Sequence, residues 1–254
     1  GFKGCCPGSD SERSGYQVPP RGVWSKRGAL VEAAIDSLSL HALDPSLFVL
    51  STNGSGRFDL QYQATLEFWR NGAETLWALD ADDAGDVASQ RLFNALVLRD
   101  QLSVRFDVSP EQIDEWMLQK KIISRPDPDP RSMFAGLDMD LPEGVMGVVS
   151  FSIPKAIGSV KRSKDEIIEM SAADIRSVFE RYRAKRLRPV NAKDWNEVWT
   201  AGGQAACNAY EQKFLAPESL TTPTKPAPSV TAPPAAPPSR WKRSPAAPSQ
   251  RPTP

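Results

Sequence analysis

Two aspartates, Asp80 and Asp82, follow directly after the apolar run Thr75–Leu79. A short apolar run that ends in Asp-x-Asp, just before a helix start, is typical of a buried parallel strand. Such strands deliver side chains to the carboxyl edge of a sheet, where α/β proteins bind their ligands. Because side chains alternate along a strand, carboxylates two residues apart point the same way and repel each other. A hard divalent cation such as Mg²⁺ would relieve this repulsion, since it prefers oxygen ligands.

A second pair of acids lies near the first predicted strand. Glu32 falls where the predicted strand Ala29–Val31 ends, and Asp36 lies one helical turn further on. If the two strands are neighbours in the sheet, both acids face the same crevice as Asp80 and Asp82. Carboxylates from two strand ends can hold a metal against a phosphate and move a proton to or from a reacting oxygen. This set therefore indicates phosphoryl transfer.

The second aspartate of the motif also has a simpler interpretation. Asp82 or Asp83 can cap the helix predicted from Ala84, because a carboxylate at a helix N-terminus accepts backbone N–H groups and is favoured by the dipole. An Asp-x-Asp pair alone favours a cap or a surface position, and only the upstream acids shift the balance towards a metal site. Asp83 and Asp86 are expected to be solvated or capping residues.

The elements that position these acids alternate between strands and helices over residues 28–107. Strands are predicted at Ala29–Val31, Leu47–Leu50, Thr75–Leu79 and Leu102–Phe106, and helices at Ala33–Leu43, Asp59–Arg70 and Ala84–Arg99. Strands separated by helices predict a parallel sheet. The expected fold class is therefore α/β, with a small, mostly parallel sheet flanked by helices.

The segments on either side of this core are less regular. Residues 1–27 indicate a loop or the end of an upstream module, and residues 108–188 indicate an α-rich extension of uncertain fold. Within it, Ser109 followed by proline is a helix-start signal that predicts a helix through Lys121. The other elements predicted there are a strand pair at Val145–Ile153, a helix start at Ser163–Glu166 and a helix at Ser171–Arg186.

The stretch Arg181–Arg188 is strongly basic and contains one aromatic residue. Cations of this kind can bind a nucleic-acid backbone by neutralising its phosphates. The alternative is a solvated helix face that needs no ligand. The candidates for nucleic-acid binding are Arg181, Arg183, Lys185 and Arg186.

Residues 189–215 predict a last helix that packs on the core, and residues 216–254 predict a tail. Trp195 and Trp199 lie one turn apart and are expected in the core, with base stacking as the alternative. More than half of the chain's 23 prolines fall in the tail. Such a composition cannot bury a core and predicts disorder.

The composition of the 254-residue chain excludes some classes of site. Its net charge is zero, which neither supports nor excludes a nucleic-acid partner. Three cysteines and the single histidine, His41, offer no zinc-binding spacing, and a reducing cytoplasm is the expected location. No apolar run approaches the roughly 20 residues that span a bilayer, so no membrane partner is expected. The chain starts without methionine and is expected to be a fragment.

Taken together, these motifs resemble the Toprim domain, which is shared by bacterial-type primases, type IA and II topoisomerases and some nucleases. The residues that carry the resemblance are Glu32 with Asp36, the turn Thr52-Asn53-Gly54, and Asp80-x-Asp82-x-Ala84-Gly85. The later segment Lys193–Glu197, Lys-Asp-Trp-Asn-Glu, is similar to one that often follows the core in primase-type proteins of plasmids and mobile elements.

The resemblance implies a role for each matched residue. Glu32 would be the general acid or base, or a carboxylate close to the metal, with Asp36 beside it in the catalytic set. Asp80 and Asp82 would bind Mg²⁺, for which Mn²⁺ is an alternative. The supporting residues would be Gly54, Gly85 and Asp194. Ala33 departs from the family, which usually has glycine directly after the glutamate.

The implied function is magnesium-dependent nucleotidyl or phosphoryl transfer on nucleic acid, as in a DNA primase or a primase-like protein of a mobile element. Its substrates would be a single-stranded DNA template and nucleoside triphosphates, and a helicase or another replication protein would be a partner. One alternative is a Toprim nuclease that uses the same carboxylates. Another is a non-catalytic DNA-binding accessory protein with a degenerate site. A topoisomerase is disfavoured, because no tyrosine-bearing partner domain of the required size is evident.

Overall fold

The computed structural model describes residues 15–125, 146–153, 164–189 and 191–202, together with residues 205 and 208. These residues belong to a compact unit that covers residues 1–216. Residues 217–254 form a second unit. The proline-rich tail predicted at residues 216–254 and the first 14 residues of the predicted N-terminal loop lie outside the described residues.

A five-stranded sheet forms the centre of the first unit, in the order β1-β3-β2-β4-β8. Its parallel strands are β2 (Arg27–Val31), β3 (Phe48–Ser51), β4 (Glu74–Trp77) and β8 (Ala184–Arg186). β1 (Tyr16–Val18) lies in the predicted N-terminal loop and pairs antiparallel with β3. The strands that precede Glu32 and Asp80 are neighbours, with Leu30 opposite Trp77. The predicted α/β class and mostly parallel sheet are confirmed.

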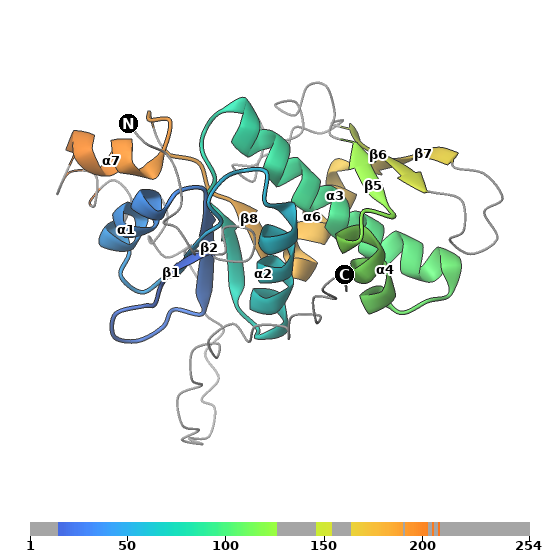
Figure 1. Cartoon of the computed structure of the whole chain (residues 1–254), viewed down its shortest axis with the longest axis horizontal. Helices are drawn as coiled ribbons and strands as arrows, with labels where there is room; N and C mark the ends of the chain where they lie inside the picture. Colours follow the sequence, from blue (N-terminus) through green and yellow to red (C-terminus); the bar gives the residue numbers. More distant parts are fainter. Residues whose placement is uncertain are drawn as a thin grey trace, which may run out of the picture. The chain divides into compact units, whose positions relative to one another are not determined.

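Helices cover both faces of this sheet (Figure 1). α1 (Ala34–Leu43) and α7 (Trp195–Gly202) pack together on one face. α2 (Phe58–Arg70), α3 (Asp83–Phe106) and α6 (Ala172–Tyr182) lie on the other. A strand that is covered on both faces must be apolar on both, which explains why β2 reads as a continuous apolar run. Ala29 and Val31 pack in a core cluster with Leu40, Leu43 and Trp195.

The predicted strand Leu102–Phe106 is wrong, because these residues extend α3 to Phe106. The alternation of Leu102, Val104 and Phe106 imitates a strand in sequence. In the structure Leu102 is buried, whereas Val104 is 84% exposed, which suits one inward and one outward position of a helix. The helix ends at Asp107, whose φ of 51° is left-handed.

The extension after α3 contains more strand than the sequence predicted. It begins with α4 (Pro110–Leu118), whose predicted start is confirmed by the Ser109 side chain, which accepts the Gln112 N–H. A three-stranded antiparallel sheet follows, formed by β5 (Ile123–Arg125), β6 (Met146–Ile153) and β7 (Lys164–Ser171). The expected strand pair at 145–153 is one strand, and the expected helix start at 163–166 is wrong.

Charge pairing explains why β7 was not recognised as a strand. Its residues Asp165 and Glu166 interrupt any hydrophobic alternation. Asp165 pairs with Arg125 of β5, and Glu166 pairs with Arg105 of α3. These partners lie far away in sequence, so the local pattern cannot reveal them.

The helix predicted at Ser171–Arg186 is also shorter than expected. α6 ends at Tyr182, and Arg183 has a left-handed φ of 49°. The chain then forms β8 beside β4, with Lys185 opposite Leu76. The basic run is therefore not one helix face: it spans the end of α6, the turn at Arg183 and the edge strand β8.

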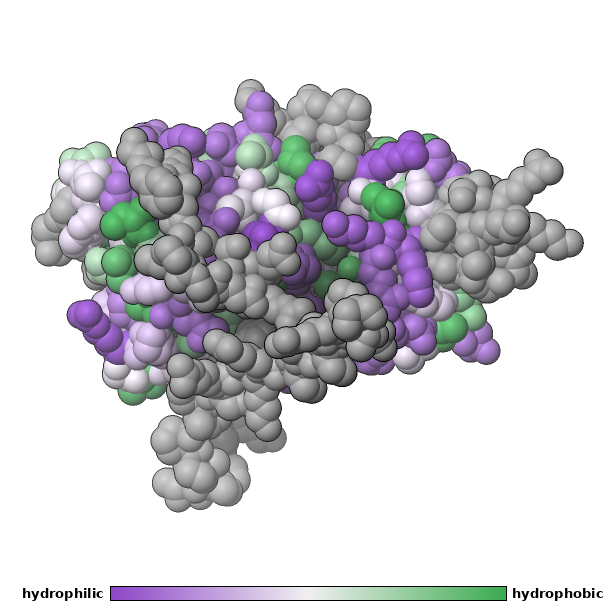
Figure 2. Space-filling model, in the orientation of Figure 1, coloured by the Kyte–Doolittle hydropathy of each residue, from purple (hydrophilic) through white to green (hydrophobic). Residues whose placement is uncertain are grey.

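The surface of the described residues is mostly polar on the face drawn in Figure 2. Hydrophilic side chains cover most of it, and hydrophobic ones form small separate patches. Among the helices of the described ranges, none is long and apolar enough to cross a membrane.

Candidate active site

The two acids that the sequence placed at neighbouring strand ends are in contact. Glu32 directly follows β2, and Asp80 lies three residues beyond the end of β4. The backbone N–H of Asp80 donates to Oε1 of Glu32 at 3.3 Å. Burial, partly offset by this hydrogen bond, raises the pKa of Glu32. A carboxyl group that holds its proton at higher pH suits general acid or base work.

The end of β3 and the turn that follows it hydrogen-bond the backbone carbonyl of Glu32. The carbonyl oxygen of Glu32 accepts the N–H of Gly54 at 2.9 Å and the hydroxyl of Ser51 at 3.1 Å. Gly54 has a φ of 126°, a backbone conformation that side-chain-bearing residues rarely adopt. From α2, the amide of Gln61 donates to Oγ1 of Thr52 and to the carbonyl of Gly54. The turn thereby fixes the backbone that carries the candidate acid.

Asp80 is the acid with an unsatisfied oxygen. Its buried Oδ1 has no hydrogen-bond partner among the described residues. Burial and the negative charges of its neighbours raise the pKa of Asp80 to about 7. The neighbouring acids, in decreasing order of effect, are Glu32, Asp36, Asp82 and Asp194. An unpaired buried carboxylate among other acids is costly, which is the condition that a cation would relieve.

Asp82 differs from Asp80 because both of its oxygens have partners. Oδ1 accepts the Gly85 N–H at 3.0 Å, which confirms Asp82 as the N-cap of α3. Oδ2 lies 3.4 Å from Nζ of Lys193. Desolvation acts to raise the pKa of Asp82, but the Gly85 and Lys193 interactions outweigh it and lower the pKa. The helix-cap interpretation of this residue therefore holds alongside any role in metal binding.

These acids fit Mg²⁺ in their chemistry. Within the described ranges, no group of three His, Cys, Asp or Glu side chains is arranged to hold a metal ion. Mg²⁺ does not require such a cage, because it usually binds one or two carboxylates and completes its shell with water and substrate phosphates. Asp80, whose Oδ1 has no partner among the described residues and whose backbone N–H contacts the Glu32 carboxylate, suits that smaller requirement.

Comparison with known families agrees with this geometry. Residues 29–116 match the Toprim-like family. The match runs from within β2 to most of α4, and it includes Glu32, the turn after β3, and the Asp-x-Asp pair. No curated protein and no solved structure matches the chain. Toprim domains occur in magnesium-dependent enzymes of nucleic-acid metabolism, among them primases, nucleases and topoisomerases.

Two small residues within the matched segment, Gly85 and Ala33, differ in whether the backbone around them requires glycine. A Cβ atom on Gly85 would clash with the carbonyl oxygen of Asp80, so α3 can start this close only with glycine. Ala33 has a φ of −115°, which any residue adopts. The backbone therefore does not require the family's glycine at position 33.

Asp36 and Asp194 are held by backbone N–H groups. Asp36 is buried; its Oδ2 accepts the Ala33 N–H at 3.3 Å and its Oδ1 accepts the Asn196 N–H at 3.1 Å. Asp194 accepts the Glu197 N–H at 2.8 Å at the start of α7. Burial, more than any other cause, raises the pKa of Asp36. Asp36 thereby joins α1 to α7, and both acids add negative charge near Asp80.

The two tryptophans of α7 take different positions. Trp195 is buried, and its indole N–H donates to the carbonyl of Ala78 at 2.7 Å, just before the Asp-x-Asp pair. Its predicted place in the core is confirmed. Trp199 is 36% exposed and belongs to the surface of α7.

The four basic candidates for nucleic-acid binding have partners within the chain. Arg181 pairs with Asp100 at 2.5 Å, and Lys185 pairs with Glu74 at 2.8 Å. Arg183 donates to the carbonyl of Gly72. These three side chains are exposed, and their role in nucleic-acid binding stays a prediction. Arg186 is different: its side chain is 1% exposed, so the predicted phosphate contact is wrong for this residue.

Arg186 and Asp86 are the residues that sequence reasoning placed wrongly. The sequence predicts Asp86 to be a solvated or capping residue, but its side chain is 1% exposed and it pairs with both Arg186 and Arg188. Arg186 lies about 100 positions from its partner, so no local pattern could have joined them. The available signal was two arginines in a segment that returns to the sheet edge beside the motif.

Proposed function

We propose that this protein is a magnesium-dependent enzyme that transfers nucleotidyl groups on nucleic acid, as a DNA primase does. The observation that carries the proposal is Asp80 at the carboxyl edge of a Toprim-like sheet: its Oδ1 has no partner among the described residues, and its backbone N–H contacts Glu32. Its substrates are a single-stranded DNA template and nucleoside triphosphates. The similarity of Lys193–Glu197 to a segment of primase-type proteins favours nucleotidyl transfer over hydrolysis.

The residues have separate tasks in this reaction. Asp80, with Glu32 and Asp82 close by, would hold Mg²⁺, which neutralises charge that builds on phosphate oxygens. Glu32 exchanges a proton with the attacking or leaving oxygen through its carboxylate, a task suited to its raised pKa. Lys193, exposed and paired with Asp82, offers an ammonium group to an anionic substrate.

The direct test is incubation of labelled single-stranded DNA with the full chain and Mg²⁺, with and without nucleoside triphosphates. Elongated product that requires triphosphates is the expected result. Shortened product without triphosphates would replace this proposal with a Toprim nuclease.

The matched variants separate the candidate metal ligands from a neighbouring acid. The double variant Asp80→Asn/Asp82→Asn should lose synthesis by at least about 100-fold, because the metal's charge stabilisation is lost. Asp83→Asn, which changes an exposed acid on the same helix turn, should keep most activity. Synthesis at the wild-type rate by the double variant would overturn the proposal. An inactive wild type without specific Mg²⁺ heat in calorimetry would indicate a DNA-binding accessory protein instead.

A further inference from the structure

A buried arginine contacts the backbone of the candidate site at Asp80. The side chain of Arg186, at the end of β8, is 1% exposed. Its Nη1 donates to the carbonyls of Trp77 at 2.9 Å and Leu79 at 2.6 Å, and its Nη2 donates to the carbonyl of Asp80 at 2.5 Å. One guanidinium thus binds the end of β4 and the segment that leads to Asp80.

The charge of Arg186 is only partly balanced. Its carboxylate partner is Asp86 at 3.3 Å, and that acid is shared with Arg188. Burial of a cation costs several kcal/mol unless it is well paired, so its place in this fold needs a reason. The surrounding acids give one, because the positive charge of Arg186 acts on Glu32 and opposes the repulsion within the acidic cluster.

We propose that Arg186 is a positioning residue for magnesium binding. It fixes the backbone between β4 and Asp80, so that the unpartnered carboxylate stays beside Glu32, and it supplies a buried positive charge beneath the acids. The inference rests on the proposed function for the identity of the cation, but the contacts of Arg186 stand apart from it.

Arginine suits this task better than lysine does. A planar guanidinium presents several N–H groups in fixed directions, whereas an ammonium group is a single point on a flexible stem. Lysine at position 186 would keep the charge and lose part of the set of carbonyl contacts. It should therefore show an intermediate effect.

Arg188 is a matched control. It pairs with the same carboxylate, Asp86, but its side chain is 39% exposed. Among the described residues, its hydrogen bond goes to Asp86 and none goes to the β4 carbonyls. A variant of Arg188 removes a cation near the site and leaves the backbone contacts of Arg186 in place.

The experiment compares Arg186→Gln, Arg186→Lys and Arg188→Gln in the full chain. Circular dichroism establishes folding, calorimetry with MgCl₂ measures metal affinity, and hydrogen exchange follows the peptide that contains Leu79–Asp82. Arg186→Gln should weaken Mg²⁺ binding about 10- to 100-fold, the usual effect of losing a residue that supports metal ligands. Exchange in that peptide should rise, while exchange in α2 stays unchanged. The Mg²⁺ affinity of Arg186→Lys should lie between those of Arg186→Gln and the wild type. The affinity of Arg188→Gln should stay within about twofold of the wild type.

Each outcome decides a different point. A folded Arg186→Gln variant with wild-type Mg²⁺ affinity and wild-type exchange overturns the inference. If that variant does not fold, Arg186→Lys decides, and wild-type values in both measurements overturn it in the same way. A wild type that binds no Mg²⁺ removes the proposed function and with it the metal-positioning role. Faster exchange in the variants would then assign Arg186 a backbone role only.

Discussion

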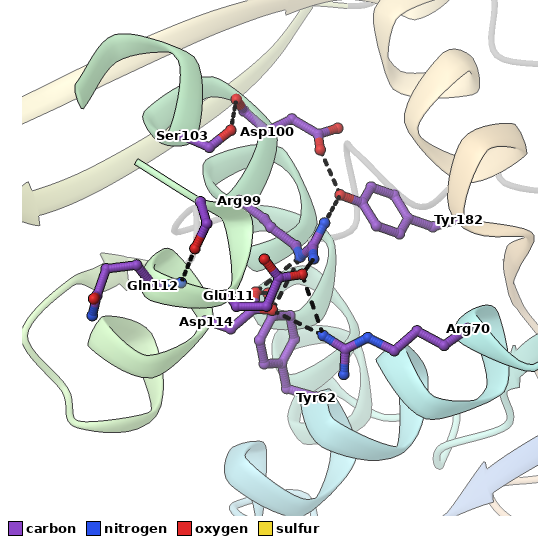
Figure 3. Close-up of polar contacts among 10 residues, drawn as sticks. Tyr62, Arg70, Arg99, Asp100, Ser103, Glu111, Gln112, Asp114 and Tyr182 are labelled. Carbon is purple, nitrogen blue, oxygen red and sulfur yellow. Dashed lines mark hydrogen bonds and ion pairs between the residues drawn. The ribbon is translucent and has the colours of Figure 1, made fainter. Parts of the chain in front are cut away.

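The acids at the two ends of α3 lie in different electrostatic environments. Just before the helix starts, Asp80 has a buried oxygen without a partner among the described residues. Towards its end, Arg99 donates to Asp114 at 2.9 Å, and Asp114 also accepts the hydroxyl of Tyr62 at 2.7 Å (Figure 3). Among the described residues, the first region leaves a buried acid oxygen unsatisfied, and the second satisfies its acids from within the chain.

The paired region is a network that joins four helices. The helices are α2, α3, α4 and α6, and the hydroxyl of Tyr182 on α6 donates to Asp100 on α3 at 2.6 Å. Arg70 and Glu111 extend the network towards the surface of α2 and α4. Because α6 leads into β8, the network fixes the segment that carries Arg186 back to the sheet.

The difference separates acids that stabilise the fold from the acids that we propose for metal binding. A buried ion pair is strongly destabilised when one partner is removed. An acid held near other acids behaves in the opposite way, because its charge already opposes folding. Functional sites are the places where such costs persist. Removal of an acid should therefore change the stability in opposite directions in the two regions.

The largest expected effect is in the paired network. Asp114→Ala leaves the buried guanidinium of Arg99 without its main carboxylate and should lower the free energy of unfolding by about 3–5 kcal/mol. Urea denaturation followed by circular dichroism measures this loss. Asp59→Ala, which removes an acid 58% exposed at the start of α2, should change stability by less than about 0.5 kcal/mol. A loss below about 1 kcal/mol for Asp114→Ala would mean that the network does not stabilise the fold.

The opposite sign is expected at the candidate site. Asp80→Asn keeps the shape of the side chain and removes a charge that the neighbouring acids repel. In the absence of Mg²⁺ it should raise the free energy of unfolding by about 1 kcal/mol, a modest value because the carboxylate is partly exposed. The same variant should lose specific Mg²⁺ binding in calorimetry. Destabilisation of the metal-free protein would show that Asp80 is a structural acid like those of the network.

The sequence predicted the candidate site better than the surroundings that shape it. Glu32 and Asp80 follow strand ends, and strand ends are readable from local hydrophobic patterns. The distinction between Asp80 and Asp82 was predictable only in part: the cap that Asp82 forms is local in sequence, but its second partner, Lys193, lies more than 100 residues away. For the same reason, the sequence predicts Arg186 as an exposed cation, whereas its side chain is buried. Contacts between distant segments decide which charges are buried, and one sequence does not encode them in any local period.

A smaller effect concerns the cation that pairs with the helix cap. Lys193→Gln removes an ammonium group that competes with Mg²⁺ for Oδ2 of Asp82. Because the pair is exposed, the gain in Mg²⁺ affinity should be only about two- to threefold, and it should shrink at high salt. Calorimetry at two ionic strengths measures it. Weaker Mg²⁺ binding in this variant would indicate that Lys193 supports the metal site rather than competing with it.

The smallest expected effect is on the pH dependence of stability, to which His41 and the acids of the candidate site contribute with opposite signs. His41 on α1 is buried, and this desolvation lowers its pKa. Below pH of about 6.5 the unfolded chain binds a proton at this residue more readily than the folded chain. The stability supplied by the neutral ring is therefore complete above that pH and decreases as the pH falls towards the lowered pKa. The raised pKa of the site acids acts in the opposite direction, since those groups favour the folded state as the pH falls. His41→Gln should thus remove the loss of stability that occurs as the pH falls from 7 to 5, as measured by denaturation curves. Its Mg²⁺ affinity at pH 7.5 should not change. An unchanged pH profile of stability would show that the ring is protonated equally in the folded and unfolded states.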